Sequence, residues 1–246
     1  MAAGPPVPSM TDSDRREVRT TYDRIAAHFS ATREHAWPEV RAFVEEARPG
    51  EDGDGAKRSG AGASGDRIET ALDLGCGNGR HAELLAGRAA RVVGADLSGE
   101  LLAVARERAA ERGYADSLAL VQADAGTLPL ADGAVDLATY VATVHHLPTR
   151  QARVDSLDEL TRVLAAGGRA LVSAWSVTHS KFDATEGFDT TVDWTLPGGE
   201  TVGRFYHVYD LAEFERDLRA SALAVDRVYE REGNCYARVR KGNAHT

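Results

Sequence analysis

The chain has 246 residues, of which 43% are apolar and 27% charged, and its formal net charge is −9. This length and composition predict a water-soluble cytoplasmic protein with one α/β domain. No run approaches the roughly 18 apolar residues that cross a bilayer, and the two cysteines, Cys76 and Cys235, are too few for a disulfide framework or a structural zinc site.

The basic residues are nearly all arginine, since Lys57, Lys181 and Lys241 are the three lysines beside twenty aspartates. Few lysines and many aspartates fit a protein that works in concentrated salt, where hydrated carboxylates keep a surface soluble. A GC-rich genome would produce the same bias. The acidic balance also argues against general affinity for nucleic acid, which usually depends on a basic patch.

The first 48 residues have the pattern of two helices. Apolar side chains recur at helical spacing from Tyr22 to Phe29, and Pro38 opens a second helix. We expect residues 1–48 to form part of a lid over the substrate. Residues 49–67 contain six glycines and almost nothing to bury, which predicts a flexible linker or insertion before a core at 68–246.

From residue 69 onward, strand and helix patterns alternate, which predicts a mostly parallel sheet covered by helices on both faces. The predicted strands are Glu69–Leu74, Arg91–Asp96, Leu118–Ala123, Val135–Ala142 and Arg169–Trp175. The predicted helices are Arg80–Ala86, Gly99–Arg112 and Gln151–Ala166, the last ending at Gly167-Gly168. After Trp175 we expect irregular chain to about Glu200, then GRFYHVY and a helix capped by Asp210. Two strands close the chain, Leu223–Glu230 and Cys235–Arg240, joined around Gly233-Asn234.

The segment ALDLGCGNGRH, residues 71–81, leaves the first strand through three glycines and enters a helix. Ligands of open α/β sheets bind beyond the carboxyl ends of the strands. Three aspartates occupy such ends: Asp73 on the first strand, Asp96 on the second and Asp124 just past the third. We therefore expect the ligand of this protein to meet three carboxylates.

A phosphate group fits this loop poorly. No lysine lies near it, the spacing is GxGxG rather than GxGxxG, and Asp73 puts a carboxylate beside the position that a pyrophosphate would occupy. A ligand with a cationic group and vicinal hydroxyls fits better, with Asp73 facing an ammonium, Asp96 accepting from both ribose hydroxyls and Asp124 accepting from an exocyclic amine. These groups describe S-adenosylmethionine.

With DLGCGNG, GADLS and QADAGTLPL at these positions, the chain resembles class I S-adenosylmethionine-dependent methyltransferases over residues 68–240. The resemblance implies a Rossmann-like fold: a seven-stranded, mostly parallel sheet with an antiparallel last strand and helices on both faces. It also implies S-adenosyl-L-methionine as cofactor. The expected cofactor-binding residues are Asp73, Gly75, Gly77, Gly79, Asp96, Leu97, Asp124, Ala125 and Val141. A protein that binds the cofactor without catalysing transfer is an alternative.

Three further stretches bear on the methyl acceptor: YDRIAAHFSATREHAWP (22–38), VATVHHLPTRQARVDSLDEL (141–160) and GRFYHVYDLAEF (203–214). They resemble the wobble-uridine tRNA carboxymethyl methyltransferases, which esterify the carboxylate of 5-carboxymethyluridine in the anticodon. The resemblance implies two partners, the tRNA anticodon loop and a small zinc-bearing activator protein that forms a heterodimer, and with the composition it predicts an archaeal, halophilic source. A small-molecule O- or N-methyltransferase of the same fold is the second hypothesis.

The expected reaction requires no general base, because a carboxylate with a pKa near 4 is ionised at pH 7 and can attack a sulfonium methyl directly. The enzyme must instead hold an anion, which an arginine does through two parallel hydrogen bonds. The resemblance assigns the catalytic roles to Arg33, His145, Arg204 and Tyr206. It assigns substrate binding to Trp37, His146, Arg150, Trp175, His207 and Asn234. For Arg150, Tyr206 and His207, the alternative role is to brace the lid. No metal site is predicted.

Overall fold

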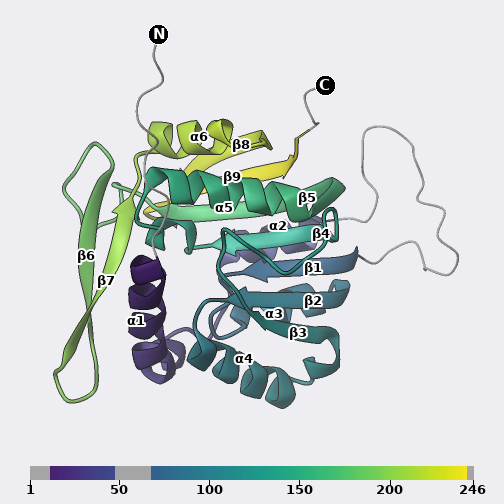
Figure 1. Cartoon of the computed structure of the whole chain (residues 1–246), viewed down its shortest axis with the longest axis horizontal. Coiled ribbons are helices and arrows are strands. Elements are labelled where there is room, and N and C mark those ends of the chain that lie inside the picture. Colours follow the sequence, from purple (N-terminus) through teal and green to yellow (C-terminus); the bar gives the residue numbers. More distant parts are fainter. Residues whose placement is uncertain (1–11, 48–67, 243–246) are drawn as a thin grey trace, which may run out of the picture.

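The computed structural model describes residues 12–47 and 68–242, so the predicted linker at 49–67 lies outside the described residues. The described chain forms a seven-stranded sheet in the order β3-β2-β1-β4-β5-β9-β8 (Figure 1). Its strands are β1 (Ile68–Leu74), β2 (Ala89–Asp96), β3 (Leu118–Gln122), β4 (Val135–Val141), β5 (Leu164–Trp175), β8 (Leu223–Arg231) and β9 (Asn234–Lys241). The first five pair in parallel, and β9 lies antiparallel between β5 and β8. The predicted fold class and the antiparallel last strand are confirmed.

Helices cover both faces of this sheet. They are α1 (Asp12–Ala31), α2 (Pro38–Glu46), α3 (Arg80–Ala86), α4 (Gly99–Arg112), α5 (Arg150–Val163) and α6 (Leu211–Ala220), with short 3-10 turns η1 (Ala115–Ser117) and η2 (Val144–His146). Successive side chains of a strand point to opposite faces. In β1, Leu72 and Leu74 pack in the cluster that includes residues of α5 and α6, whereas Ala71 packs in the cluster of α2 and α3. Apolar residues on both sides of each strand therefore explain the two layers of helices.

The predicted irregular stretch between Trp175 and Glu200 is wrong in its second half. Residues there form β6 (Phe188–Thr195), which pairs antiparallel with β7 (Thr201–Val208) as a separate two-stranded sheet. Side chains of β6 alternate between exposed and half-buried, as in a strand with one solvated face. Figure 1 shows this hairpin beside α1, at the end of the molecule toward which the parallel strands run.

Two predicted boundaries also need correction. The helix α5 ends at Val163 rather than at Gly167-Gly168, because Leu164 is extended, fully buried and paired with Val135 at the start of β5. The glycine pair instead lies where the β4–β5 register shifts. The closing hairpin turns at Glu232 and Gly233, both with positive φ, and Asn234 already belongs to β9.

Candidate active site

A cleft of about 1150 Å³, counting the solvent at its mouth, lies at the carboxyl ends of β1, β2 and β4, where α1 borders it. Many predicted site residues line it. They are Arg33, Trp37, Gly75, Gly77, Asp96, Leu97, Asp124, Ala125, Val141, His145, His146, Trp175 and Tyr206. The fold therefore brings together residues that are spread over most of the chain.

The glycine loop is a tight turn at the end of β1. The backbone amides of Gly75 and Cys76 both donate to the carbonyl oxygen of Ala95, at 2.7 and 3.0 Å. Gly75 has a φ of +70°, and a Cβ added to it would overlap the side chain of Thr143. Glycine is required here because a left-handed backbone and a crowded wall leave no room for a side chain. Gly79, also left-handed, caps the start of α3 outside the cleft lining.

Asp73 is the most deeply buried of the three predicted aspartates, with 1% of its surface exposed. The Thr139 hydroxyl donates to Oδ1 over 2.8 Å, while Oδ2 is buried without a hydrogen-bond partner among the described residues. Burial raises the pKa of this carboxyl to about 7, against the opposing effects of the Thr139 hydrogen bond, the backbone amide of Ala82 and the Arg80 charge. An unpartnered buried carboxylate oxygen beside the cleft fits the ammonium group of the predicted cofactor.

Asp96 and Asp124 are held by backbone amides at the ends of β2 and β3. Asp96 accepts from Gly77 over 2.8 Å and from Ser98 over 2.9 Å, and burial raises its pKa. Asp124 accepts from the Gly126 amide over 2.7 Å. A carboxylate has about four lone-pair sites, so both groups retain acceptor capacity for ribose hydroxyls and an exocyclic amine.

One residue of this end was missed at the level of sequence. Arg80, the first residue of α3, lines the cleft with its guanidinium carbon 5.4 Å from the ring centroid of Trp37. Burial lowers its pKa to about 10, and no described carboxylate lies within 4 Å of it. Together with Asp73 it supplies one cation and one anion, as the amino-acid end of S-adenosylmethionine requires. The signal was the arginine that follows GCGNG.

The opposite end of the cleft is cationic. Arg204 is 4% exposed, and its Nη1 donates to the hydroxyl of Tyr206 over 2.6 Å. The guanidinium carbons of Arg33 and Arg204 lie 5.0 and 4.9 Å from the ring centroid of Trp194. Burial and the charge of Arg204 lower the pKa of Arg33. Neither arginine forms an ion pair with a described carboxylate. Arg33 lines the cleft, whereas Arg204 lies outside the cleft lining and lines an adjoining hollow.

Both histidines of η2 are neutral. His145 is 1% exposed, and its Nδ1 accepts from the Trp175 amide over 2.9 Å. His146 Nδ1 lies 2.9 Å from the carbonyl oxygen of Phe205 and must donate to it, so Nε2 accepts from the hydroxyl of Tyr22 over 2.7 Å. Burial lowers the pKa of His145 well below its usual range and that of His146 to about 3. Neither ring can supply a positive charge at pH 7.

Three predicted substrate-binding residues lie outside the cleft lining and have other partners. Arg150 donates to Asp217 over 2.7 Å, and His207 Nδ1 lies 2.7 Å from Asp189. Asn234 is nine-tenths buried, and its side-chain amide donates to the backbone of the preceding turn. These contacts hold parts of α6, the β6–β7 hairpin and the β8–β9 turn in place. The role of the three residues in substrate binding stays a prediction.

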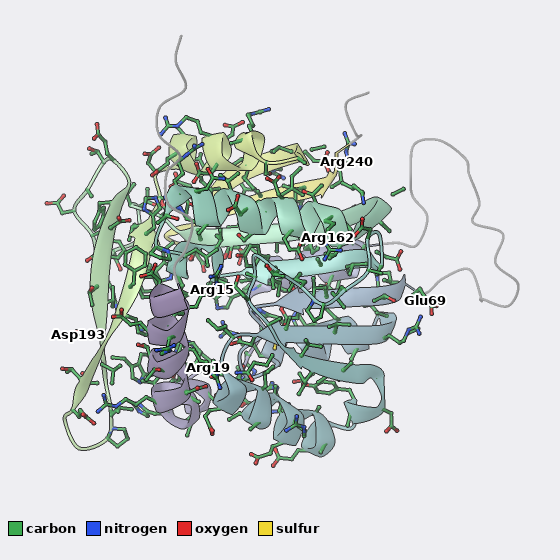
Figure 2. All side chains as sticks on the ribbon, in the orientation of Figure 1. Arg15, Arg19, Glu69, Arg162, Asp193 and Arg240 are labelled. Carbon is green, nitrogen blue, oxygen red and sulfur yellow. The ribbon has the colours of Figure 1, made fainter. Side chains whose placement is uncertain are left out.

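The helix α1 touches both ends of the cleft. At the end of the cleft near Asp96, which we call the donor end because the methyl donor is expected there, Arg15 Nε donates to Asp124 over 2.9 Å and the Ser98 hydroxyl donates to Asp23 over 2.7 Å. Tyr22 contacts His146 at the opposite, cationic end, which we call the acceptor end because the methyl acceptor is expected there. Figure 2 shows Arg15 and Arg19 on the part of α1 nearest the sheet. The N-terminal helix is therefore part of the wall of the site.

Within residues 12–47 and 68–242, no helix is both long and apolar enough to cross a membrane. The same described part of the chain holds no group of three histidine, cysteine or acidic side chains arranged to bind a metal ion.

Residues 72–172 match a family model described as a methyltransferase domain. Among curated proteins, the tRNA (carboxymethyluridine(34)-5-O)-methyltransferase of Saccharomyces cerevisiae is 31% identical over 190 residues, 76% of this chain and 59% of that protein. The Arabidopsis thaliana protein of the same name is 31% identical, over 69% of this chain and 35% of its own length. The Mus musculus tRNA (carboxymethyluridine(34)-5-O)-methyltransferase ALKBH8 is 30% identical, over 69% of this chain and 22% of its own length. The chain thus spans between about a fifth and three fifths of the length of these relatives.

Solved structures of low identity share the fold. A structure named as the DhpI complex with S-adenosylhomocysteine has a TM-score of 0.65 at 20% identity, covering 94% of this chain and 98% of that one. A chain in the complex between the Haloferax volcanii Trm112 methyltransferase activator and a methyltransferase has a TM-score of 0.63 at 16% identity, covering 93% and 99%. The structure of the [4+2]-cyclase SpnF has a TM-score of 0.66 at 18% identity, covering 98% of this chain and 99% of that one. Since one neighbour is named a cyclase, the fold alone does not fix the reaction.

Proposed function

Because this chain carries the domain and fold of the S-adenosyl-L-methionine-dependent methyltransferases, and has that compound as its cofactor, we propose that it methylates tRNA. The acceptor in this proposal is the carboxylate of 5-carboxymethyluridine at the wobble position, and the product is the methyl ester. The relatives named as carboxymethyluridine methyltransferases support this acceptor. The observation that carries the proposal is the cationic acceptor end, where Arg33 lines the cleft and both Arg33 and Arg204 contact Trp194.

The cofactor, when bound, supplies an electrophilic methyl group on a sulfonium. The carboxylate oxygen of the acceptor would take that methyl group, the methyl–sulfur bond would break, and no proton would have to move. The task of the protein is therefore to bind and orient. Arg33, which lines the cleft, holds the anion, and Trp194 limits the freedom of the Arg33 and Arg204 guanidinium groups through cation–π contacts.

The neutral histidines suit this chemistry. A positively charged imidazolium next to the donor would repel the sulfonium, whereas neutral His145 and His146 leave the cationic charge with the arginines. Trp175 and Tyr206, whose ring centroids are 4.4 Å apart in a stacked arrangement, form an apolar wall of the cleft near these histidines. This wall excludes water and offers a surface for the uracil ring.

We also propose that the N-terminal helices form part of a lid over the substrates. The contacts of α1 with Asp124, Ser98 and His146 support this role, because all three residues line the cleft.

A small activator protein is the second partner that we propose, on the model of the neighbouring complex with Trm112. Its binding place in the proposal is the edge strand β3. The sequence of β3, LALVQ, contains no charge, whereas the other edge strand, β8, carries four charged residues in LAVDRVYER. Charged edge strands resist pairing with another chain, and uncharged apolar ones invite it. Full solubility and activity of the chain expressed alone would refute dependence on an activator.

The decisive experiment uses anticodon stem-loops with and without 5-carboxymethyluridine at the wobble position. The protein, alone and with an activator, is incubated with S-adenosylmethionine, and the digested nucleosides are measured by mass spectrometry. The methyl ester is expected only from the carboxymethylated stem-loop. Absence of the ester under both conditions, with an unchanged tRNA profile in a deletion strain, would instead favour the small-molecule methyltransferase.

A further inference from the structure

A second hollow adjoins the acceptor end of the cleft. It lies between the C-terminal part of α1, the loop that follows β5, and the β6–β7 hairpin, and Lys181 and Trp194 are among its lining residues. Arg33 and Trp175 line both the cleft and this hollow. A ligand held by Arg33 in the cleft would therefore continue into the second hollow.

The second hollow is lined by more cations than anions. Arg33, Lys181 and Arg204 contribute positive groups, while Asp193, labelled on β6 in Figure 2, contributes one exposed carboxylate. None of the three cations forms an ion pair with a carboxylate among the described residues. Arg204 is the sharpest case, since it is 4% exposed and its Nε has no hydrogen-bond partner within the described chain.

The cations are positioned rather than loosely distributed. Trp194 contacts the guanidinium groups of Arg33 and Arg204, and its own Nε1 donates to His28 of α1 over 3.1 Å. The Lys181 ammonium lies 5.6 Å from the ring centroid of Trp175. A buried charge without a partner is costly, so a structure that fixes such charges in place indicates an anionic ligand.

We propose that the second hollow binds the phosphodiester of the nucleotide next to the methylated uridine, with Lys181 as its outer contact and Arg204 beneath. This inference rests on the proposed tRNA substrate. The acceptor carboxylate provides one anion for the cleft, whereas a nucleoside within RNA brings phosphates on both sides. Lysine is a point charge that suits a phosphate, and Lys181 is exposed where incoming RNA can reach it.

The test compares two acceptors, the free nucleoside 5-carboxymethyluridine and the anticodon stem-loop that contains it. Lys181→Gln is expected to raise the KM for the stem-loop about five- to tenfold, and Lys181→Glu to raise it further. Lys181→Arg should retain the wild-type KM. The kcat/KM for the nucleoside, which has no phosphate, should stay within twofold. Losing one phosphate contact to single-stranded RNA should also reduce the slope of log KM against log salt by about 0.7.

A matched control is Arg219→Gln, which removes an exposed cation on α6 that lines neither hollow. It should leave both acceptors unaffected. An unchanged stem-loop KM and salt slope in Lys181→Gln, or an equal loss with the nucleoside, would overturn the phosphate site. If the wild-type protein methylates neither acceptor, the proposed function fails instead, so the two failures can be distinguished.

Discussion

Replacing Asp73 with asparagine removes the buried charge that we expect to pair with the ammonium of S-adenosylmethionine. The substitution keeps the size of the side chain and an oxygen for the Thr139 hydroxyl, which lies 2.8 Å from Oδ1. A hydrogen bond to a charged group contributes about 1.5–3 kcal/mol, and each 1.4 kcal/mol is tenfold in affinity. The Kd for the cofactor should therefore rise about 10- to 150-fold.

The pH dependence gives a second signature. In the cofactor-free protein the pKa of Asp73 is raised to about 7, so the group is protonated below that pH and the carboxylate is present above it. Wild-type affinity should thus level off as the pH rises above 7 and weaken as the pH falls below 7, approaching a tenfold loss per unit. Arg80 and Asp96, the nearby charges, remain in the variant. Asp73→Asn should lose this pH dependence.

The same raised pKa predicts that the ionised Asp73 lowers the stability of the cofactor-free fold, although it favours cofactor binding. A carboxyl whose pKa is higher in the folded than in the unfolded chain stabilises the fold below its unfolded pKa of about 3.9, and this contribution is lost as the pH rises through about 7. At pH 8 the cofactor-free Asp73→Asn variant should therefore melt at a higher temperature than the wild type. Adding cofactor should narrow or reverse that difference.

Calorimetric titration with S-adenosylmethionine and its demethylated product, at pH values from 5.5 to 8.5, measures the affinities. Thermal melts of the cofactor-free proteins measure stability. Asp116→Asn, an exposed aspartate in η1, is the matched control and should change neither quantity. If Asp73→Asn binds the cofactor as tightly as the wild type at pH 8, the assigned partnership between this carboxylate and the ammonium is wrong.

Three other substitutions probe the remaining parts of the site. Arg33→Gln should lower kcat/KM for the carboxymethylated stem-loop about 10- to 100-fold while the cofactor Kd stays within twofold; parallel loss of both would place Arg33 at the donor end. Gly75 has a left-handed φ of +70°, and the added methyl group of Gly75→Ala would overlap the Thr143 side chain. This substitution should lower the free energy of unfolding in urea by about 2–4 kcal/mol, and an unchanged urea midpoint would contradict the need for glycine. Tyr22→Phe removes the hydrogen bond to His146 and should lower the free energy of unfolding by about 1 kcal/mol and raise the KM for the stem-loop. An unchanged KM would show that this contact of α1 does not contribute to acceptor binding.

The donor end of the site could be predicted from the sequence because its signals are local. Asp73 and the glycine loop lie in one short segment, and Asp96 ends the next strand, so strand order and the carboxyl-end rule bring them together. The alternation of strand and helix segments along the chain likewise predicts the parallel sheet. These inferences need no knowledge of distant contacts.

The acceptor end could be predicted less completely, because its contacts join remote segments. The sequence predicts that Arg150 and His207 either contact the substrate or brace the lid. Their partners on α6, Asp217 and Glu213, can be recognised only in the folded chain. The strand β6 was missed because its stability depends on pairing with β7 and on packing of Trp194 against α1. Neither effect is visible in a local window.

The placement of one helix against both ends of the cleft has a thermodynamic consequence. On α1, Tyr22 bonds to the acceptor side and its neighbour Asp23 bonds to the donor side. If binding of the methyl donor orders this helix, the RNA that binds next does not have to pay the same cost in conformational entropy. The effect of the RNA on the affinity for the donor is equal in size, because coupling between two ligands is reciprocal. The two substrates should therefore bind with positive cooperativity, and replacement of the donor by its demethylated product should change the residence time of the RNA.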